Sequence, residues 1–161
     1  MMEGHSAAMT DTPGSTPAGA MLIGGGETGD LIRAHDWAAT PLGPLDRWPA
    51  SLRAHVQTML SSPVAMAILW GPTGVLLYND LYAAVCGPRH PEAMGRSVLD
   101  IWPEARDFNL AVIAAGLAGE ARSFHAQELE LWRYGAPEQV WMDLEYLPLR
   151  DDAGAPIGCL A

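Results

Sequence analysis

The residues best suited to chemistry lie on one predicted strand, residues 123–133, where His125 and Gln127 alternate with acidic and apolar side chains. A histidine can ligate haem iron or donate to a carbonyl, and a glutamine can hydrogen-bond a ligand. Successive side chains of a strand point to opposite faces. Burying the two intervening glutamates is costly, whereas burying Leu129 and Leu131 is favourable. We therefore expect the leucines to face inward and to bring His125 and Gln127 with them.

The next predicted strand, residues 140–149, shows the same alternation. Asp143 and Glu145 share one parity and are expected to face solvent. The other parity is apolar or aromatic and is expected to face inward: Val140, Met142, Leu144 and Tyr146. Two strands thus predict a mainly apolar wall with a few polar groups, which is typical of a small-molecule pocket.

The candidate pocket residues come from these strands and from neighbouring apolar segments: Met66, Ile68, Tyr78, Phe108, His125, Gln127, Met142 and Tyr146. Structural alternatives stay open for several of them. His125 could simply be solvated, and Tyr78 and Tyr146 could be core residues whose hydroxyls are satisfied. Outside this set, Asn79 is expected to cap a helix, and His90 to be structural in a loop.

Catalytic and metal motifs are not found in the sequence. No Ser-His-Asp order or phosphate-binding loop occurs, and the glycines at 24–26 lack a following GK[ST]. The two cysteines, Cys86 and Cys159, have neither CxxC spacing nor a histidine partner, which argues against a disulfide framework or a zinc site. One enzymatic alternative remains, a small α+β cavity of the isomerase or dehydratase type, in which Asp100 or Glu104 would act as the base.

Composition narrows the class further. The chain has 161 residues, enough for one ordinary domain, and 49% of them are hydrophobic. Its formal net charge of −10 repels phosphate backbones, so we expect no nucleic-acid partner. No apolar run is long enough to span a membrane, and residues 1–20 lack the pattern of a secretory signal. These features favour a cytoplasmic location.

The order of predicted elements is helices, a hairpin, more helices and three further strands. Residues 1–26 are rich in Gly, Ala, Ser, Thr and Pro and are predicted to form a flexible tail. Helices are predicted from Thr28, over 49–61, 81–85, 91–94, 98–102 and 109–117, and strands over 64–70, 75–78, 123–133, 140–149 and 157–161. The apolar stripe of the second helix (Leu52, Val56, Met59 and Leu60) could cover the sheet or pair with a second subunit.

Four stretches in this order resemble PAS domains of bacterial sensor histidine kinases. HDWAATPLGPLDRWP (35–49) is similar to a helical extension that precedes such domains, and LWGPTGVLLYNDLY (69–82) is similar to their first hairpin. GPRHPEAMGRSVLDIWPE (87–104) resembles the helical segment that follows, and YLPLRDDAGAPIGCL (146–160) resembles the last two strands and their acidic turn.

The resemblance implies an α+β fold: a five-stranded antiparallel sheet with helices between strands 2 and 3, preceded by a helical extension. The domain boundaries would be 1–26 for the flexible tail, 27–62 for the extension and 63–161 for the PAS core. The family normally continues from the last strand into a signalling helix and a kinase or cyclase module. Because this sequence stops at that strand, we expect it to be a sensor fragment.

The implied function is sensing and dimerisation, without enzymatic activity in this segment. The expected partners are a second copy of the chain, a small-molecule ligand and a downstream output module, with neither nucleic acid nor membrane. The output would be a histidine kinase of a two-component system; a cyclic-dinucleotide enzyme or a transcription regulator is the alternative. No cofactor is predicted: Cys86 lies in AAVCGPRH, which lacks the cysteine motif of flavin-binding light sensors, and no histidine has a clear haem-ligating context.

Strand parity on residues 123–133 gives a first testable prediction. Leu129→Glu should unfold the domain, because it places a carboxylate on the inner face, whereas Glu128→Leu should leave it folded. Thermal unfolding of both variants checks this, and similar melting temperatures would contradict the assigned parity.

Overall fold

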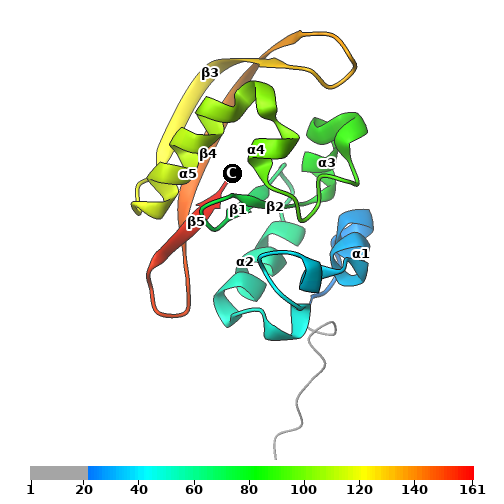
Figure 1. The fold of residues 1–161 in the computed structure, drawn as a ribbon, viewed down its shortest axis with the longest axis vertical. Helices are drawn as coiled ribbons and strands as arrows, with labels where there is room; N and C mark the ends of the chain where they lie inside the picture. Colours follow the sequence, from blue (N-terminus) through cyan, green and yellow to red (C-terminus); the bar gives the residue numbers. More distant parts are fainter. Residues whose placement is uncertain (1–21) are drawn as a thin grey trace, which may run out of the picture.

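The computed structural model describes residues 22–161, and a single five-stranded antiparallel sheet organises them (Figure 1). The strand order is β2-β1-β5-β4-β3. The first and last strands along the chain, β1 and β5, are therefore neighbours in the sheet. The strands are β1 (Ala67–Trp70), β2 (Val75–Tyr78), β3 (Arg122–Leu131), β4 (Glu138–Arg150) and β5 (Pro156–Leu160). The predicted α+β class, with helices between strands 2 and 3, is confirmed. Residues 1–21 of the predicted tail lie outside the described residues.

Two groups of helices cover opposite sides of the β1–β2 hairpin (Figure 1). On one side lie α3 (Asp80–Cys86), α4 (Val98–Ile101) and α5 (Arg106–Leu117), with short 3-10 turns at Gly87–Arg89 and Pro103–Ala105. On the other side lie α1 (Gly26–Ala34) and α2 (Ala50–Leu60), joined through 3-10 turns at Trp37–Ala39 and Leu45–Arg47. Every residue of β1 and β2 is buried as a result. No helix within residues 22–161 is long and apolar enough to cross a membrane.

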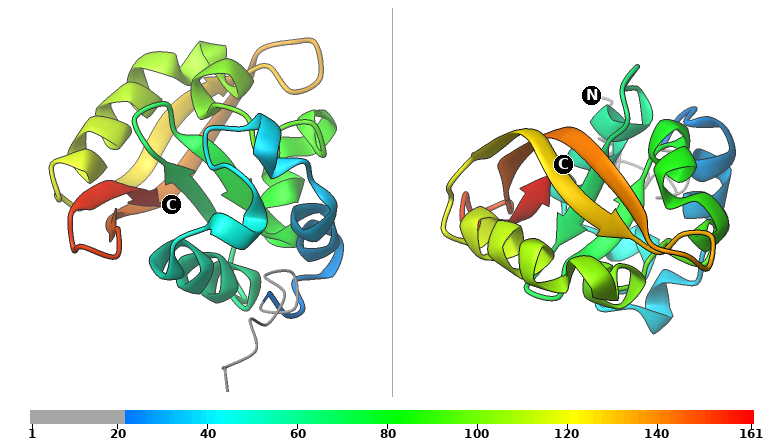
Figure 2. Two further views of the ribbon diagram at one scale, coloured as in Figure 1. Left: turned by 60° about the horizontal axis from the view of Figure 1, so that its bottom comes forward. Right: turned by 90° about the horizontal axis from the view of Figure 1, so that it is seen from above.

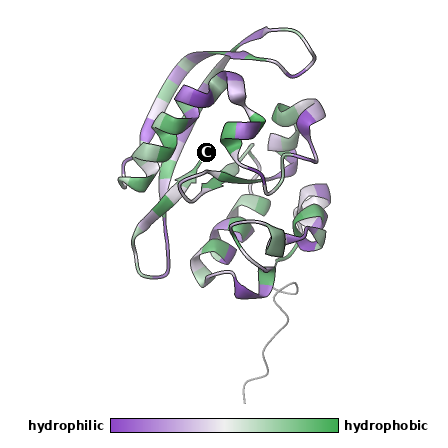
Figure 3. Ribbon diagram, in the orientation of Figure 1, coloured by the Kyte–Doolittle hydropathy of each residue, from purple (hydrophilic) through white to green (hydrophobic). Residues whose placement is uncertain are grey.

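The apolar stripe of α2 packs within its own chain. Leu52, Val56 and Met59 are fully buried, and α2 contacts β1 and β2. Of the two alternatives left open by the sequence, covering the sheet is therefore the one found. The helices α1 and α2 do not extend over β3 and β4 (Figure 2). Most residues of these two strands therefore alternate between half-buried and exposed, and hydrophilic and hydrophobic residues are mixed along them (Figure 3).

Strand β1 begins at Ala67, three residues later than predicted. Val64 is exposed. The Val64 carbonyl and the Met66 N–H are bonded by the Asn79 side chain and not by a neighbouring strand. The Asn79 amide donates to the Val64 carbonyl at 2.8 Å, and its Oδ1 accepts from the Met66 N–H at 3.1 Å. The apolar run 64–70 predicted a continuous strand because nothing in that run itself indicates this competing partner.

The extension helices are capped by the core. Neither α1 nor α2 has a capping side chain of its own. Oδ1 of Asp80 accepts hydrogen bonds from the Thr28 N–H and hydroxyl, both at 2.7 Å. Asp152, in the β4–β5 turn, accepts from the Ser51 N–H at 2.7 Å. Carboxylates are favourable at helix N-termini because the free N–H groups and the helix dipole both point toward them.

The glycines at 24–26 make this docking possible. Gly26 has φ +55, and a Cβ there would come within 2.0 Å of a carboxylate oxygen of Asp80. Just before them, Leu22 is buried and the Ile23 N–H donates to Gln57 of α2 at 2.8 Å. Residues 22–26, which the sequence analysis placed in the tail, therefore contact the extension and the core.

Acidification should weaken the α1 docking. Burial alone would raise the pKa of Asp80, but the hydrogen bonds from Thr28 and the Glu27 backbone, together with the nearby His90, hold the pKa below its ordinary value of 3.8. A lowered native pKa means that the carboxylate's contribution to stability is complete at neutral pH. It is lost as the pH falls below 3.8 and through the native pKa, because the unfolded chain takes up the proton first.

We therefore expect Asp80→Asn to be less stable than the wild type at pH 7 and to lose less stability on acidification to about pH 3. Urea unfolding at both pH values measures the difference. Asp46→Asn is the control, because the Asp46 carboxylate is exposed and accepts no hydrogen bond within residues 22–161. Parallel acid profiles for wild type and Asp80→Asn would contradict the capping role.

Candidate ligand pocket

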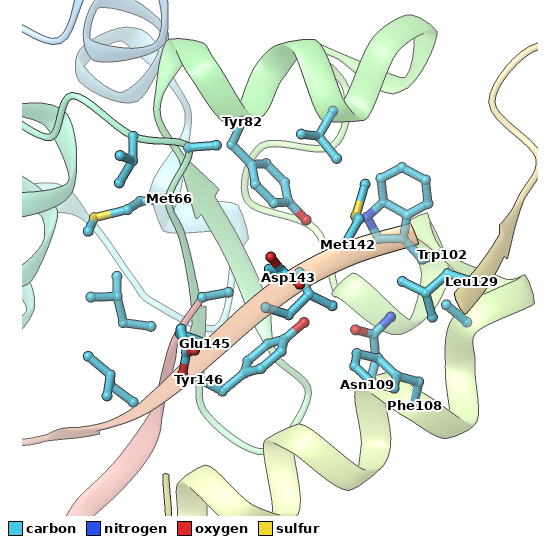
Figure 4. Close-up of a pocket in the computed structure, with 18 of the residues that line it drawn as sticks. Met66, Tyr82, Trp102, Phe108, Asn109, Leu129, Met142, Asp143, Glu145 and Tyr146 are labelled. Atoms are coloured by element: carbon cyan, nitrogen blue, oxygen red, sulfur yellow. The ribbon is translucent and has the colours of Figure 1, made fainter. Parts of the chain in front are cut away.

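A cavity of about 640 Å³ lies between the helices and the inner face of the sheet (Figure 4). Its walls come from the segment before β1, from α3, from the region of α4 and α5, and from β3, β4 and β5. Cavities of this size accommodate small organic ligands. Most of its lining is aliphatic or aromatic, and its polar side chains are few.

Four of the eight sequence-predicted residues meet in this cavity. Met66 precedes β1, Phe108 lies on α5, and Met142 and Tyr146 face inward from β4. The expected alternation on β4 is present: Tyr146 is buried, Met142 is half-buried, and the residues between them with the opposite parity are exposed. The two apolar positions of β3, Leu129 and Leu131, also line the cavity, as their parity predicted.

Ile68 and Tyr78 lie elsewhere in the core. Ile68 is completely buried in the centre of the sheet, opposite Leu77 and Leu160 on the neighbouring strands. The Tyr78 hydroxyl is hydrogen-bonded to Nδ1 of His90 at 2.9 Å, outside the cavity lining. The structure thus gives Tyr78 the satisfied core role that the sequence analysis had left open.

His125 points away from the cavity because β3 contains a bulge. The pairing between β3 and β4 shifts register between Phe124 and Gln127, and Ala126 adopts a φ of +47. An inserted residue of this kind reverses the parity of everything before it. Phe124 therefore turns inward, and His125 is exposed beside Asp143.

Gln127 keeps its inward parity but does not reach the cavity. Its side chain is half-buried in a neighbouring groove near Glu104, and its amide donates to the Glu128 carbonyl at 3.0 Å. Strand parity alone could not show that this position lies beyond the end of the pocket.

Among the pocket residues missed from the sequence, three carry neutral polar groups: Tyr82 on α3, Trp102 after α4 and Asn109 on α5. The signal for Asn109 was present, because it is the one amide in the apolar segment 108–117. Tyr82 and Trp102 carried no comparable signal, since large aromatic residues on short helices are most often core residues.

The polar groups of these residues have few protein partners. The indole N–H of Trp102 is buried beside the Tyr82 hydroxyl, and this contact lowers the pKa of Tyr82 against the larger raising effect of burial. The Asn109 side chain is buried and makes no hydrogen bond within residues 22–161. Buried polar groups are normally satisfied, so an unpaired amide at a cavity wall is a position that a ligand or ordered water can satisfy.

The aromatic hydroxyls of the cavity are uncharged at physiological pH. Burial raises the pKa of Tyr82 and of Tyr146 well above the ordinary value of 10, so both hydroxyls stay protonated and can donate. No lysine, arginine or histidine of the described chain lines the cavity. Asp143 and Glu145 border it through β4, but their carboxylates bond the outer face of β3, at Ala126 N–H and the Ser123 hydroxyl.

The remaining reactive groups are held in structural roles. Glu104 accepts from Arg89 and from the Trp132 N–H, both at 2.8 Å. Burial tends to raise the pKa of Glu104, but these hydrogen bonds bring it below its ordinary value. Burial raises the pKa of each of Cys86 and Cys159 to about 12, so both remain thiols. No cluster of three metal-ligating side chains occurs in the described part of the chain.

A helix-covered antiparallel sheet encloses a mainly apolar cavity, the arrangement of a small ligand-binding domain. The comparison with known families agrees: a family model described as PAS fold matches residues 60–161. The chain belongs to the PAS-fold family, and its fold is the one that the sequence resemblance implied. No curated protein matches it.

The chain has two asparagines, and comparing their substitutions tests which one stabilises the fold. Asn79 is buried and makes four side-chain hydrogen bonds, to Met59, Val64, Met66 and Tyr82. Asn109 is buried and makes none. We expect Asn79→Ala to lower the free energy of unfolding by about 2–4 kcal/mol, because it removes a helix cap and leaves backbone groups unsatisfied.

Asn109→Leu should leave the free energy of unfolding unchanged or raise it by up to about 1 kcal/mol, because an unsatisfied amide is replaced by a similar apolar volume. Denaturant unfolding measures both variants. Equal destabilisation would show that Asn109 supports the fold, and the pocket would lose one of its polar groups.

Proposed function

We propose that this protein is the sensory input domain of a cytoplasmic bacterial signalling protein, which binds a small organic ligand in the pocket. The observation that carries the proposal is a mainly apolar cavity of about 640 Å³ whose wall holds the Asn109 amide without a hydrogen bond to residues 22–161. An unsatisfied buried polar group costs stability. A ligand that pairs with it explains why it is present.

The pocket is connected to the end of the sheet through β5. Leu160 and Ala161 line the cavity, and the Ala161 backbone is bonded to Ala67 in both directions, at 2.7 and 2.9 Å. A ligand that prefers one arrangement of these residues shifts the population toward it. In the parent protein, the output module would follow β5 and receive this shift.

The sequence resemblance supports a histidine kinase of a two-component system as that output. The four stretches that carry it include both the extension and the last strand. In this role the segment itself has no catalytic activity, and it works as a homodimer. The outer face of β4, where Trp141 and Leu147 are exposed, is the surface available for pairing.

Native mass spectrometry of freshly purified protein tests the proposal. We expect an additional small-molecule mass on the wild-type chain, and its loss from Met142→Trp, in which the larger side chain fills the cavity. Gln139→Trp is the control, because residue 139 is exposed on the same strand. The proposal is contradicted if the wild-type chain retains no small molecule and no compound of a metabolite library raises its melting temperature.

A further inference from the structure

We propose that the pocket takes a neutral ligand with a lactam or primary carboxamide group on an apolar body, and that this group pairs with the Asn109 side-chain amide through two hydrogen bonds. This inference deepens the proposed function and rests on it, because the pocket must first bind a ligand. It assigns the chemical class of that ligand from the position of one amide, from the geometry of amide pairing and from the charge of the cavity wall.

The Asn109 side chain is enclosed, unpaired and accessible from the cavity. It lies in the first turn of α5, is 6% exposed and makes no hydrogen bond within residues 22–161. In the described residues, the unpaired side-chain nitrogen and oxygen atoms that are fully enclosed by protein belong to Ser51, Arg53 and Trp102. The unpaired amide atoms of Asn109 are not among them and therefore keep accessible surface. Figure 4 shows this amide directed away from α5 into the space that the pocket residues surround.

An amide side chain has two groups that need a partner. Its NH2 group donates and its carbonyl accepts, and the two lie side by side in one plane. A ketone or an ether pairs with the NH2 group but leaves the carbonyl unsatisfied, which costs free energy in a buried site. A ligand with an N–H donor beside a carbonyl acceptor satisfies both groups of Asn109 at once.

The need for a donor and an acceptor on one edge restricts the kind of amide. An open-chain secondary amide prefers the trans form, in which the N–H and the C=O point in opposite directions. Such an amide cannot use both groups on Asn109. A lactam ring holds its amide in the cis form, and a primary carboxamide has one N–H on the same side as its carbonyl. Both therefore present the edge that Asn109 requires.

The rest of the cavity wall requires an uncharged, apolar body. No lysine, arginine or histidine of the described chain lines the cavity, and the carboxylates of Asp143 and Glu145 bond groups of β3 on its outer face. An ionised ligand would lose its hydration without gaining a partner of opposite charge. Phe108, Met142 and Tyr146 offer aromatic and thioether surface on which an apolar ring can pack.

Three bicyclic probes of nearly identical shape test this assignment: hydrocarbostyril, 2-tetralone and tetralin. Hydrocarbostyril is a lactam, 2-tetralone has a CH2 group in place of the lactam N–H and keeps the carbonyl, and tetralin has neither polar group. We expect the lactam to bind about 5-fold more tightly than 2-tetralone, which corresponds to one additional hydrogen bond. Titration calorimetry on the full chain measures the three affinities.

Asn109→Leu removes the proposed partner from the cavity wall. It should weaken hydrocarbostyril about 30-fold and 2-tetralone about 5-fold, because they lose two hydrogen bonds and one, and leave tetralin nearly unchanged. Gln127→Leu is the matched control, since it makes the same kind of change to an amide in the neighbouring groove, and it should alter none of the three affinities. Thermal transitions of both variants check that they are folded before titration.

The side-chain NH2 resonances of Asn109 provide a second readout on the wild-type chain. We expect hydrocarbostyril to shift them strongly and tetralin to shift them little, because only the lactam forms hydrogen bonds with this amide. Two-dimensional NMR spectra of the side-chain amides measure both shifts, so the test does not depend on the stability of a variant.

The assigned ligand class is overturned if Asn109→Leu changes the affinity of all three probes equally, because the amide would then face water in the bound state. Binding of 2-tetralone at least as tightly as hydrocarbostyril, or an Asn109 resonance that hydrocarbostyril leaves unshifted, overturns it as well. In these cases the binding of a probe leaves the ligand-sensing proposal standing. Failure of hydrocarbostyril to bind also overturns the class, and the native mass measurement then decides separately whether the pocket holds a ligand at all.

Discussion

The hydrogen bonds of one buried side chain, Asn79, connect α2, the segment before β1 and the start of α3. Its amide donates to the last turn of α2 at Met59 and to the Val64 carbonyl, and its oxygen accepts from the N–H groups of Met66 and Tyr82. Three of these four partners are pocket residues or their backbone. Since a side-chain amide has both donors and acceptors, no apolar residue could make this junction. The pocket residues Val64, Met66 and Tyr82 are therefore linked to the end of α2 through Asn79.

The buried polar groups of the chain differ in how they are paired. Asn79 and Thr28, which join the extension to the core, are paired. Unpaired buried atoms also occur away from the pocket, at the Ser51 hydroxyl and Nε of Arg53 on α2. The Asn109 amide differs from these because it lies in the cavity wall and makes no hydrogen bond within residues 22–161. An apolar residue there would favour stability, so the presence of an amide supports an occupant of the cavity.

The sequence predicted the element order, the class of the sheet and the inward parity of β4, because those depend on local period and on punctuation by glycine and proline. It also predicted the capping role of Asn79, which the Tyr82 N–H confirms. It placed His125 in the pocket wrongly, since the bulge at Ala126 is stabilised by Asp143 on another strand. Tyr82, Trp102 and Asn109 were missed for a related reason: a pocket is formed by tertiary packing, and only Asn109 stood out locally.

Capping between residues 22–62 and the rest of the chain also explains why α1 and α2 pack where they do. An isolated α1 or α2 would be a short helix without its own N-cap, and such helices are marginal in water. Asp80 and Asp152 supply the missing acceptors only when the core is folded around them. In turn, α2 buries the outer face of β1 and β2, which would otherwise expose two apolar strands. The extension therefore depends on the core for its helix caps, and the core depends on α2 to bury its strands. A displacement of the pocket residue Met66 can reach the end of α2 through the hydrogen bonds of Asn79.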